Sequence, residues 1–387
     1  MKIGLLVSHA LHERNWIASG MARKIADKHE LVILRPKELG AVGGPWRRRV
    51  REAFLLASMV AREPGSRTYR FKLGQRRPLL ARMQIRAFRR LRDRGYDLEG
   101  AFRRWEARQR PVQAAVAATR GLDVLLWPSL IHTHNDEVEL VKSARQGQKC
   151  HIVAAPASFD TLSCKGGFLV PPDQMLVWGE ASKRHAVDYH GFKPEEVAVT
   201  GPPQFDLYHE PRKALTREIV LVAGTTVNFW ADELEMIAFL RRVPFPIVHR
   251  SHPRAGGNWS WEAMLTLRDQ LDSAMCVVTA FSTVSIEAAL MGKPSLLVGF
   301  GASAHGGSVL DHSVYEHMAE LLQWPGIILC KSMPTLCEEL NHVLSGKYEM
   351  LADELRCQAF EIARSDGKCR ERIVEAIERV HRTDHPA

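Results

Sequence analysis

Short apolar strands alternate with helical segments along this chain, and the alternation restricts its fold more than any other feature. The first example is a strand over 3–7, a polar loop over 8–14, a helix over 15–28 and a strand over 31–35. Further strands are expected over 121–129, 150–156 and 173–180, and a short strand that runs into a Gly-Pro-Pro turn is expected over 196–206. Strands that alternate with helices form a parallel sheet with helices on its faces. We therefore predict an α/β fold.

A second series of strands follows a polar, proline-containing segment at 202–216, which is typical of a connection between domains. Its strands are expected over 217–226, 245–253, 274–283, 293–301 and 326–330, and its last helices over 347–364 and 369–381. A chain of 387 residues is long enough for two cores. The sequence predicts two parallel-sheet domains that face a central cleft.

Basic charge is concentrated in residues 46–110, which hold 19 Arg and one Lys against six acidic residues. This segment has a net charge of +14, whereas the remainder has −5. Within it, RRPLLARMQIRAFRRLRDR (76–94) predicts an amphipathic helix. Three interpretations stay open: a solvated helical face, a surface for anionic lipid headgroups, and a groove for an acidic acceptor. Nucleic acid is disfavoured because no aromatic platform accompanies the arginines.

Several absences restrict the class of protein. The seven cysteines contain no CxxC pair, which is typical of a reduced cytosolic protein. Neither a secretory signal nor an apolar run of about 18 residues is visible. We therefore expect a cytoplasmic protein, peripheral on the inner membrane face if the basic segment binds lipid. There is no Asp-x-Asp, so we expect no metal that bridges a nucleotide sugar. There is also no P-loop, no GxGxxG after a strand and no GxSxG, and the last absence excludes a hydrolase elbow.

The stretch VVTAFSTVSIEAALMGKP (277–294) predicts a phosphate site. An apolar strand ends in hydroxyl residues, and a helix begins near Ser282 or Thr283. A helix N-terminus has unpaired N–H groups and a positive dipole end, and Ser282, Thr283 and Ser285 add donors. Glu287 can accept hydrogen bonds from ribose hydroxyls. The alternative is an ordinary capped helix with Glu in its first turn.

Two other strand ends of the second domain carry candidate ligand-binding residues. IVHRSHPR (247–254) includes Arg250 and His252, whose cations suit a diphosphate leaving group. VLVAGTTVNF (220–229) combines Gly224, which permits close backbone approach, with the hydroxyl of Thr225. A solvated loop is the alternative for 247–254.

Two loops of the first domain offer a general base. In ASFDTLSCKGG (157–167), Asp160 follows a strand, where it could abstract a proton, bind an acceptor hydroxyl or form an Asx-turn. His9, His12 and Glu13 follow the first strand and are the rival candidates.

Four segments resemble known enzyme families. FSTVSIEAALMGKP resembles the C-terminal-domain signature of metal-independent GT-B glycosyltransferases. HRSHPR is similar to the His-Pro segment of CDP-glycerol glycerophosphotransferases and of capsule transferases for Kdo and polysialic acid. Residues 174–206 resemble the end of the N-terminal domain in these proteins and in UDP-N-acetylglucosamine 2-epimerases. ASFDTLSCKGG is similar to a Trp-Asp-Asn-Leu-Thr-x-Lys-Gly pattern, but Phe159 replaces the Trp and Thr161 the Asn.

The resemblance implies a GT-B fold with two Rossmann-like domains. The acceptor side would be 1–212, with an Arg-rich helical insertion at about 40–120, and the donor side would be 213–365. The last segment, 366–387, would cross back to the first domain. The expected donor-binding residues are Thr225, Arg250, His252, Ser282, Thr283, Ser285 and Glu287.

The function that we expect is metal-independent transfer of a sugar from a UDP- or CMP/CDP-type nucleotide sugar. The acceptor would be a surface polysaccharide or glycolipid. His9 or Asp160 would act as the base, and His252 would assist the departing phosphate. The alternatives are a sugar-nucleotide 2-epimerase, a CDP-glycerol-type glycerophosphotransferase and a non-catalytic scaffold for polysaccharide assembly.

Overall fold

A computed structural model of the protein divides into two compact units, and each is described by itself. The first unit is 1–204 with 368–387, and the second is 205–367. The structure describes residues 1–131, 137–147, 150–211, 219–225, 230–242, 246–253, 258–303 and 306–384.

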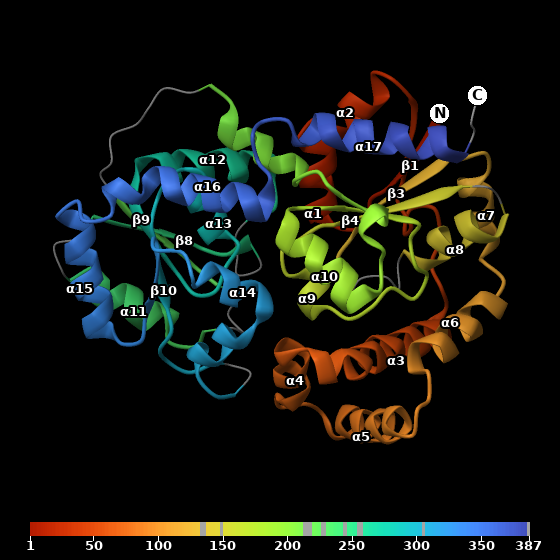
Figure 1. Cartoon of the computed structure of the whole chain (residues 1–387), viewed down its shortest axis with the longest axis horizontal. Coiled ribbons are helices and arrows are strands. Elements are labelled where there is room, and N and C mark those ends of the chain that lie inside the picture. Colours follow the sequence, from red (N-terminus) through yellow and green to blue (C-terminus); the bar gives the residue numbers. More distant parts are fainter. Residues whose placement is uncertain are drawn as a thin grey trace. The chain divides into compact units, whose positions relative to one another are not determined.

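The first unit is built on a six-stranded parallel sheet with the order β2-β1-β3-β4-β5-β6 (Figure 1). Its strands are β1 (Lys2–Leu6), β2 (Glu30–Leu34), β3 (Val124–Ser129), β4 (His151–Pro156), β5 (Gln174–Val177) and β6 (Val197–Val199). Because β1 lies between β2 and β3, the chain leaves β1 first toward one edge of the sheet and later returns to the other. The sequence-based prediction of a parallel α/β sheet is confirmed.

Helices cover both faces of this sheet. They are α1 (Ala10–His12), a π-helix (Glu13–Ala18), α2 (Met21–Ala26), α7 (Gln113–Thr119), α8 (Val138–Gly147), α9 (Thr161–Cys164), α10 (Glu180–His190) and α17 (Cys369–Asp384). The prediction of a polar loop over 8–14 is wrong, because helical structure begins at Ala10. The side chain of His9 accepts a hydrogen bond from the Leu11 amide and caps this turn, while Trp16 is buried below it.

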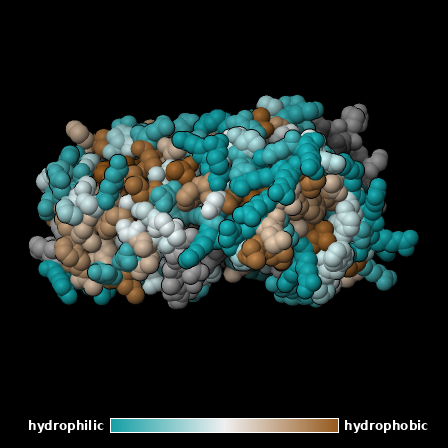
Figure 2. Space-filling model, turned by 90° about the horizontal axis from the view of Figure 1, so that it is seen from below, coloured by the Kyte–Doolittle hydropathy of each residue, from teal (hydrophilic) through white to brown (hydrophobic). Residues whose placement is uncertain are grey.

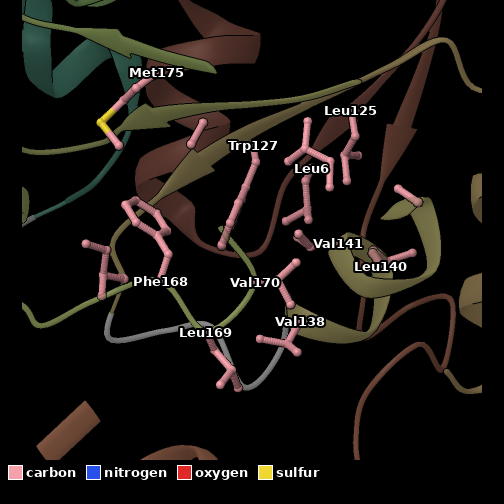
Figure 3. Close-up of a cluster of buried hydrophobic side chains, with 14 of the residues drawn as sticks. Leu6, Leu125, Trp127, Val138, Leu140, Val141, Phe168, Leu169, Val170 and Met175 are labelled. Atoms are coloured by element: carbon pink, nitrogen blue, oxygen red, sulfur yellow. The ribbon is translucent and has the colours of Figure 1, made fainter. Parts of the chain in front are cut away.

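Alternate residues of each strand enter two different apolar layers, as the pleat of a strand requires. Leu6, Leu125, Trp127 and Met175 pack on one face with side chains of α8 (Figure 3). On the other face, strand residues pack with α2 and with Ile373, Val374, Ala376 and Ile377 of α17. Arg370 of the same helix donates to the Ser19 carbonyl at 2.7 Å. The C-terminal helix is therefore part of the first unit.

The basic segment forms a helical insertion between β2 and β3. Its helices are α3 (Pro45–Arg62), α4 (Arg67–Gly74), α5 (Leu79–Asp93) and α6 (Leu98–Arg108), with a 3-10 turn at Glu63–Gly65. They share a small apolar core made of Leu56, Ala57, Val60, Leu73, Ile85 and Leu98. No helix in the described part of the chain is long and apolar enough to span a bilayer.

The second unit is built on a five-stranded parallel sheet with the order β11-β10-β9-β7-β8. Its strands are β7 (Ile219–Ala223), β8 (Ile247–Arg250), β9 (Ala274–Thr279), β10 (Ser295–Val298) and β11 (Ile327–Cys330). Its helices are α11 (Glu233–Leu240), α12 (Trp261–Ser273), α13 (Val284–Leu290), α14 (Glu316–Leu321), α15 (Met333–Leu344) and α16 (Ala352–Ala363). Three 3-10 helices, Pro203–His209, Val309–Val314 and Glu349–Leu351, complete the chain from its connection onward. Residues 212–218 of the predicted connection lie outside the described residues.

Candidate functional site

The second sheet brings two of the predicted ligand-binding loops to one place. Ligands of parallel sheets bind at the carboxyl edge, where neighbouring strands send their connections in opposite directions. In this sheet β7 lies between β8 and β9, so that point falls between β7 and β9. Thr225 follows β7, and Ser282 and Thr283 follow β9. The three residues therefore lie at the same edge of the sheet.

A carboxylate that the sequence analysis did not single out lies against the residues that follow β7. Glu233, in the first turn of α11, accepts from both the amide and the hydroxyl of Thr225 at 2.7 Å. The Nε2 of His249 lies 3.7 Å from the same carboxylate. A Cβ on Gly224 would lie 2.6 Å from Glu233 Oε1, so a larger residue there would displace this carboxylate. The group that approaches the Gly224 backbone closely is therefore the Glu233 side chain.

Arg250, Glu287 and Tyr208 lie near one another at this edge. Glu287 is buried, and its Oε1 accepts a hydrogen bond from the Tyr208 hydroxyl at 2.7 Å. Burial lowers the pKa of Arg250 from its ordinary value, and the nearby Glu287 carboxylate opposes that shift. The Arg250 guanidinium also donates to Gln270 Oε1 at 3.1 Å and to the Ala263 carbonyl at 2.6 Å.

Tyr208 was missed because it belongs to the segment that the sequence assigned to the connection between domains. The only signal was an aromatic residue with a polar tip, shortly after the Gly-Pro-Pro turn at 201–203. Such a side chain is usually bonded through its hydroxyl when buried. Its partner could not be identified without the tertiary structure.

The three hydroxyls around the start of α13 are not equivalent. Thr283 occupies the N-cap position, but its side chain makes no capping hydrogen bond. Ser282 Oγ accepts only a long bond, 3.4 Å, from the Val284 amide. Ser285 is fully buried, and its Oγ has no partner within the described ranges. Ser282 and Thr283 are half-buried and lie nearer the surface than Ser285.

His252 lies two residues beyond the end of β8 and is half-buried. Its ring meets the edge of Trp259, with ring centroids 6.0 Å apart and planes at 87°. Arg254 of the same motif lies outside the described residues. His252 and Arg250 thus follow one strand into the carboxyl edge of the second sheet.

The first sheet has its own reversal of strand order, between β1 and β3. His9 lies there, and its Nδ1 accepts a hydrogen bond from the Leu11 amide at 3.0 Å. His12 lies beneath it, fully buried. Burial and the neighbouring His9 lower the pKa of His12 to about 3, so this imidazole is neutral at physiological pH.

Glu137 is a second carboxylate that sequence reasoning missed. It is fully buried just before α8, and its Oε2 accepts from Trp127 Nε1 at 2.7 Å. Its Oε1 accepts from the hydroxyl of Ser8 at 2.5 Å, and that hydroxyl also lies 3.4 Å from His12 Nδ1. The carboxyl edge of the first sheet therefore holds a carboxylate in addition to the predicted His9 and Asp160.

Asp160 is surrounded by local partners. Its Oδ2 lies 2.7 Å from Lys165 Nζ, and its Oδ1 accepts from Ser158 Oγ at 2.7 Å. Cys164 Sγ lies 3.3 Å from Oδ2. These contacts join Asp160 to side chains of its own loop, and its charge is compensated by lysine, while its side chain makes no capping hydrogen bond to α9.

The Arg-rich insertion packs directly on this loop. Lys72 Nζ donates to the Cys164 carbonyl at 2.7 Å, and Ser58 Oγ accepts from the Gly167 amide at 2.9 Å. Gly166 has φ +95°, and a Cβ there would lie 2.8 Å from Ser58 Oγ. Two features that the sequence treated separately, the basic segment and the Asp160 loop, are therefore one structural region.

Comparisons with known proteins give structural matches only. No protein-family model and no curated protein sequence matches the chain. The Staphylococcus aureus protein MnaA, solved with UDP, is 11% identical with a TM-score of 0.51 over 98% of this chain and 96% of its own. A putative UDP-N-acetylglucosamine 2-epimerase from Listeria monocytogenes is 12% identical, with a TM-score of 0.51 over 97% and 95%.

The Methanocaldococcus jannaschii UDP-GlcNAc 2-epimerase, solved with UDP-GlcNAc and UDP, is 12% identical. It matches with a TM-score of 0.50 over 98% of this chain and 100% of its own. Identities this low establish the fold and nothing finer. The prediction of a GT-B fold with two Rossmann-like sheets is confirmed, and the chain is similar to sugar-nucleotide enzymes in its fold.

Proposed function

We propose that the protein is a glycosyltransferase that binds a nucleotide sugar on its second unit and an acceptor on its first. The observation that carries this proposal is the group formed by Arg250, Glu287 and Tyr208 at the carboxyl edge of the second sheet. A cation and a buried carboxylate at that edge match the two chemical ends of a nucleoside diphosphate.

The roles follow from the chemistry of each side chain. Arg250 and His252 would offset negative charge on the departing phosphate, which makes a metal ion unnecessary. Glu287 would accept from the ribose hydroxyls, and the Tyr208 hydroxyl would hold its carboxylate in place. Thr225, Ser282 and Thr283 would contribute hydroxyls. A UDP- or CMP/CDP-type donor fits this set, and UDP is bound by two of the proteins that share the fold.

The helical insertion favours a transferase over an epimerase, because an epimerase needs no acceptor. The insertion packs on the Asp160 loop at the carboxyl end of β4, where an acceptor would meet a base. In this proposal an acceptor hydroxyl attacks the anomeric carbon, His9 or Asp160 takes its proton, and the nucleotide leaves with the bonding electrons. The acceptor would be a surface polysaccharide or glycolipid.

The first test is thermal unfolding of the full chain with UDP, CDP, CMP, GDP or dTDP. A ligand at about 100 times its dissociation constant stabilises the folded state by about 2.7 kcal/mol. We expect one nucleotide to raise the melting temperature of the wild type but not of His252→Ala/Glu287→Ala. The matched control is His342→Ala/Glu354→Ala, which changes the same residue types on the same unit away from this edge.

The second step separates the enzyme classes, using the nucleotide sugar of the base identified. Release of free nucleotide that requires added acceptor supports the transferase. Conversion of UDP-GlcNAc to its 2-epimer without acceptor would show that the protein is an epimerase instead. Release of CMP from CDP-glycerol would show that it is a glycerophosphotransferase. If no nucleotide changes the melting temperature, a scaffold role replaces all three.

A further inference from the structure

The arginines of residues 46–110 belong to two structurally different groups. Some form ion pairs inside the protein: Arg51 with Glu106 and Glu139, Arg62 with Glu99, and Arg89 and Arg92 with Glu63. Among the rest, Arg82, Arg86 and Arg90 are exposed on α5, and their side chains have no ion-pair or hydrogen-bond partner among the described residues. The bulk charge of the segment therefore overstates what is available to a partner, and three of the available arginines lie together on α5.

The same face of α5 exposes large apolar side chains. Ile85, Phe88 and Leu91 turn inward to the core of the insertion. Leu79, Leu80 and Met83 lie on the outward side, 69%, 68% and 58% exposed. In the helical repeat, Arg86 and Arg90 follow Leu79 and Met83 along one outer stripe. Figure 2 views the side on which α5 lies in Figure 1, and shows brown apolar side chains among teal hydrophilic ones.

We propose that the outer face of α5 is a site that binds the surface of an anionic lipid bilayer. Leu79, Leu80 and Met83 would enter the boundary between headgroups and acyl chains, and Arg82, Arg86 and Arg90 would contact lipid phosphates. A helix with one apolar end and a row of cations binds a membrane surface in this way.

Charge complementarity favours an anionic lipid surface over the other possible partners of this face. Residues 64–92 contain nine Arg and one Lys and no acidic residue. A second copy that met this face symmetrically would bring the same arginines into contact, which is repulsive. Nucleic acid would satisfy the arginines but leave three large apolar side chains without a partner, because this face of α5 exposes no aromatic ring for base stacking.

The test is co-sedimentation of the full chain with phosphatidylcholine vesicles, with and without phosphatidylglycerol. It is done at about 0.1 M salt, where the Debye length is about 10 Å. The wild type should pellet with the anionic vesicles and stay in solution with neutral ones. Arg82→Gln/Arg86→Gln/Arg90→Gln should lower vesicle affinity roughly 100-fold, and Leu79→Ser/Leu80→Ser/Met83→Ser roughly tenfold or more.

The matched control is Arg49→Gln/Arg108→Gln/Arg110→Gln, which removes the same charge from exposed arginines elsewhere in the insertion. Equal losses in the two arginine triples would overturn the proposal in favour of non-specific attraction. The proposal would also be overturned if the wild type did not pellet with anionic vesicles. A wild-type dimer in sedimentation equilibrium that becomes a monomer in Leu79→Ser/Leu80→Ser/Met83→Ser would overturn it as well. Circular dichroism confirms that each variant is folded. The assay needs no nucleotide or turnover, so its result is independent of the proposed activity.

Discussion

Arg51 and Arg86 come from the same basic segment, yet their surroundings are opposite. Arg51 is fully buried and bonds Glu106 and Glu139, while Lys142 of α8 reaches the same two carboxylates. Arg86 is exposed on α5, with no ion-pair or hydrogen-bond partner among the described residues. Arg51 joins α3 to α6 and to α8, whereas Arg86 is left exposed to solvent. Arginines of one segment can therefore stabilise the fold at one position and be left exposed to solvent at another.

The largest expected effect comes from removing the buried cation. Arg51→Ala would leave Glu106 and Glu139 buried with one cation fewer, and breaking a buried pair in this way costs about 3–5 kcal/mol. Chemical denaturation measures the free energy of unfolding. Arg86→Ala is the control and should change it by less than about 0.5 kcal/mol. Equal effects of the two variants would contradict the comparison.

The buried network should also make stability depend on pH. Burial opposes ionisation of Glu139, but hydrogen bonds from Arg51 and Arg47 and the charge of Lys142 lower its pKa to about 2. A carboxyl with a lowered folded-state pKa stabilises the fold above its unfolded pKa, and this contribution is lost as pH falls toward the folded value.

The difference in unfolding free energy between wild type and Glu139→Gln should therefore be largest near pH 7. It should shrink below about pH 4.5, as the unfolded chain takes up the proton. Denaturation curves from pH 7 down to the acid limit of the fold measure this difference. Glu30→Gln, at an exposed pair with Lys2, is the control and should give a small difference at every pH. A difference that does not change with pH would refute the assignment to Glu139.

A smaller effect is expected at the second unit, where a buried carboxylate has a neutral partner. Tyr208→Phe removes the hydrogen bond to Glu287 and should lower the unfolding free energy by about 1.5 kcal/mol. If Glu287 binds ribose, the same variant should also bind the nucleotide that stabilises the wild type with lower affinity. Titration calorimetry measures that affinity, and Tyr348→Phe is a control on the same unit. A stable variant with unchanged affinity would leave Tyr208 without a role in binding.

The smallest effect is expected at a partly exposed pair within the insertion. Arg89 and Arg92 hold the pKa of Glu63 below its usual range against the opposing effect of burial. Both arginines reach solvent, so Glu63→Gln should cost at most about 1 kcal/mol and less in high salt. Denaturation at low and high salt measures both quantities. A cost as large as that of Arg51→Ala would show that burial does not separate the two groups of arginines.

Much of the fold could be predicted from the sequence because its signals are local. An apolar run followed by polar residues and a helix, as at 3–7 and 274–283, indicates a strand of a parallel sheet without knowledge of its neighbours. The helix at 76–94 followed from its apolar spacing, and α5 matches it. The loop over 8–14 was predicted incorrectly because a capping histidine and a buried tryptophan stabilise helical turns there.

The site was predictable only as a set of loops. Thr225, Arg250, His252, Ser282 and Thr283 follow strands, and strand ends of a parallel sheet share an edge. Glu233, Tyr208 and Glu137 were not predictable, since these residues carry no motif.

By itself, the sequence determined the class of fold, the ends of strands that carry polar residues and the segment that holds the basic charge. Each of these depends on residues close together in the chain. Only the tertiary structure decided which arginines face Glu106 and Glu139 and which face solvent. It also decided that Tyr208 meets Glu287 and that the insertion rests on the Asp160 loop. The physical reason is that burial and charge pairing depend on groups brought together from distant positions, and the cost or gain of each charge is set by those neighbours.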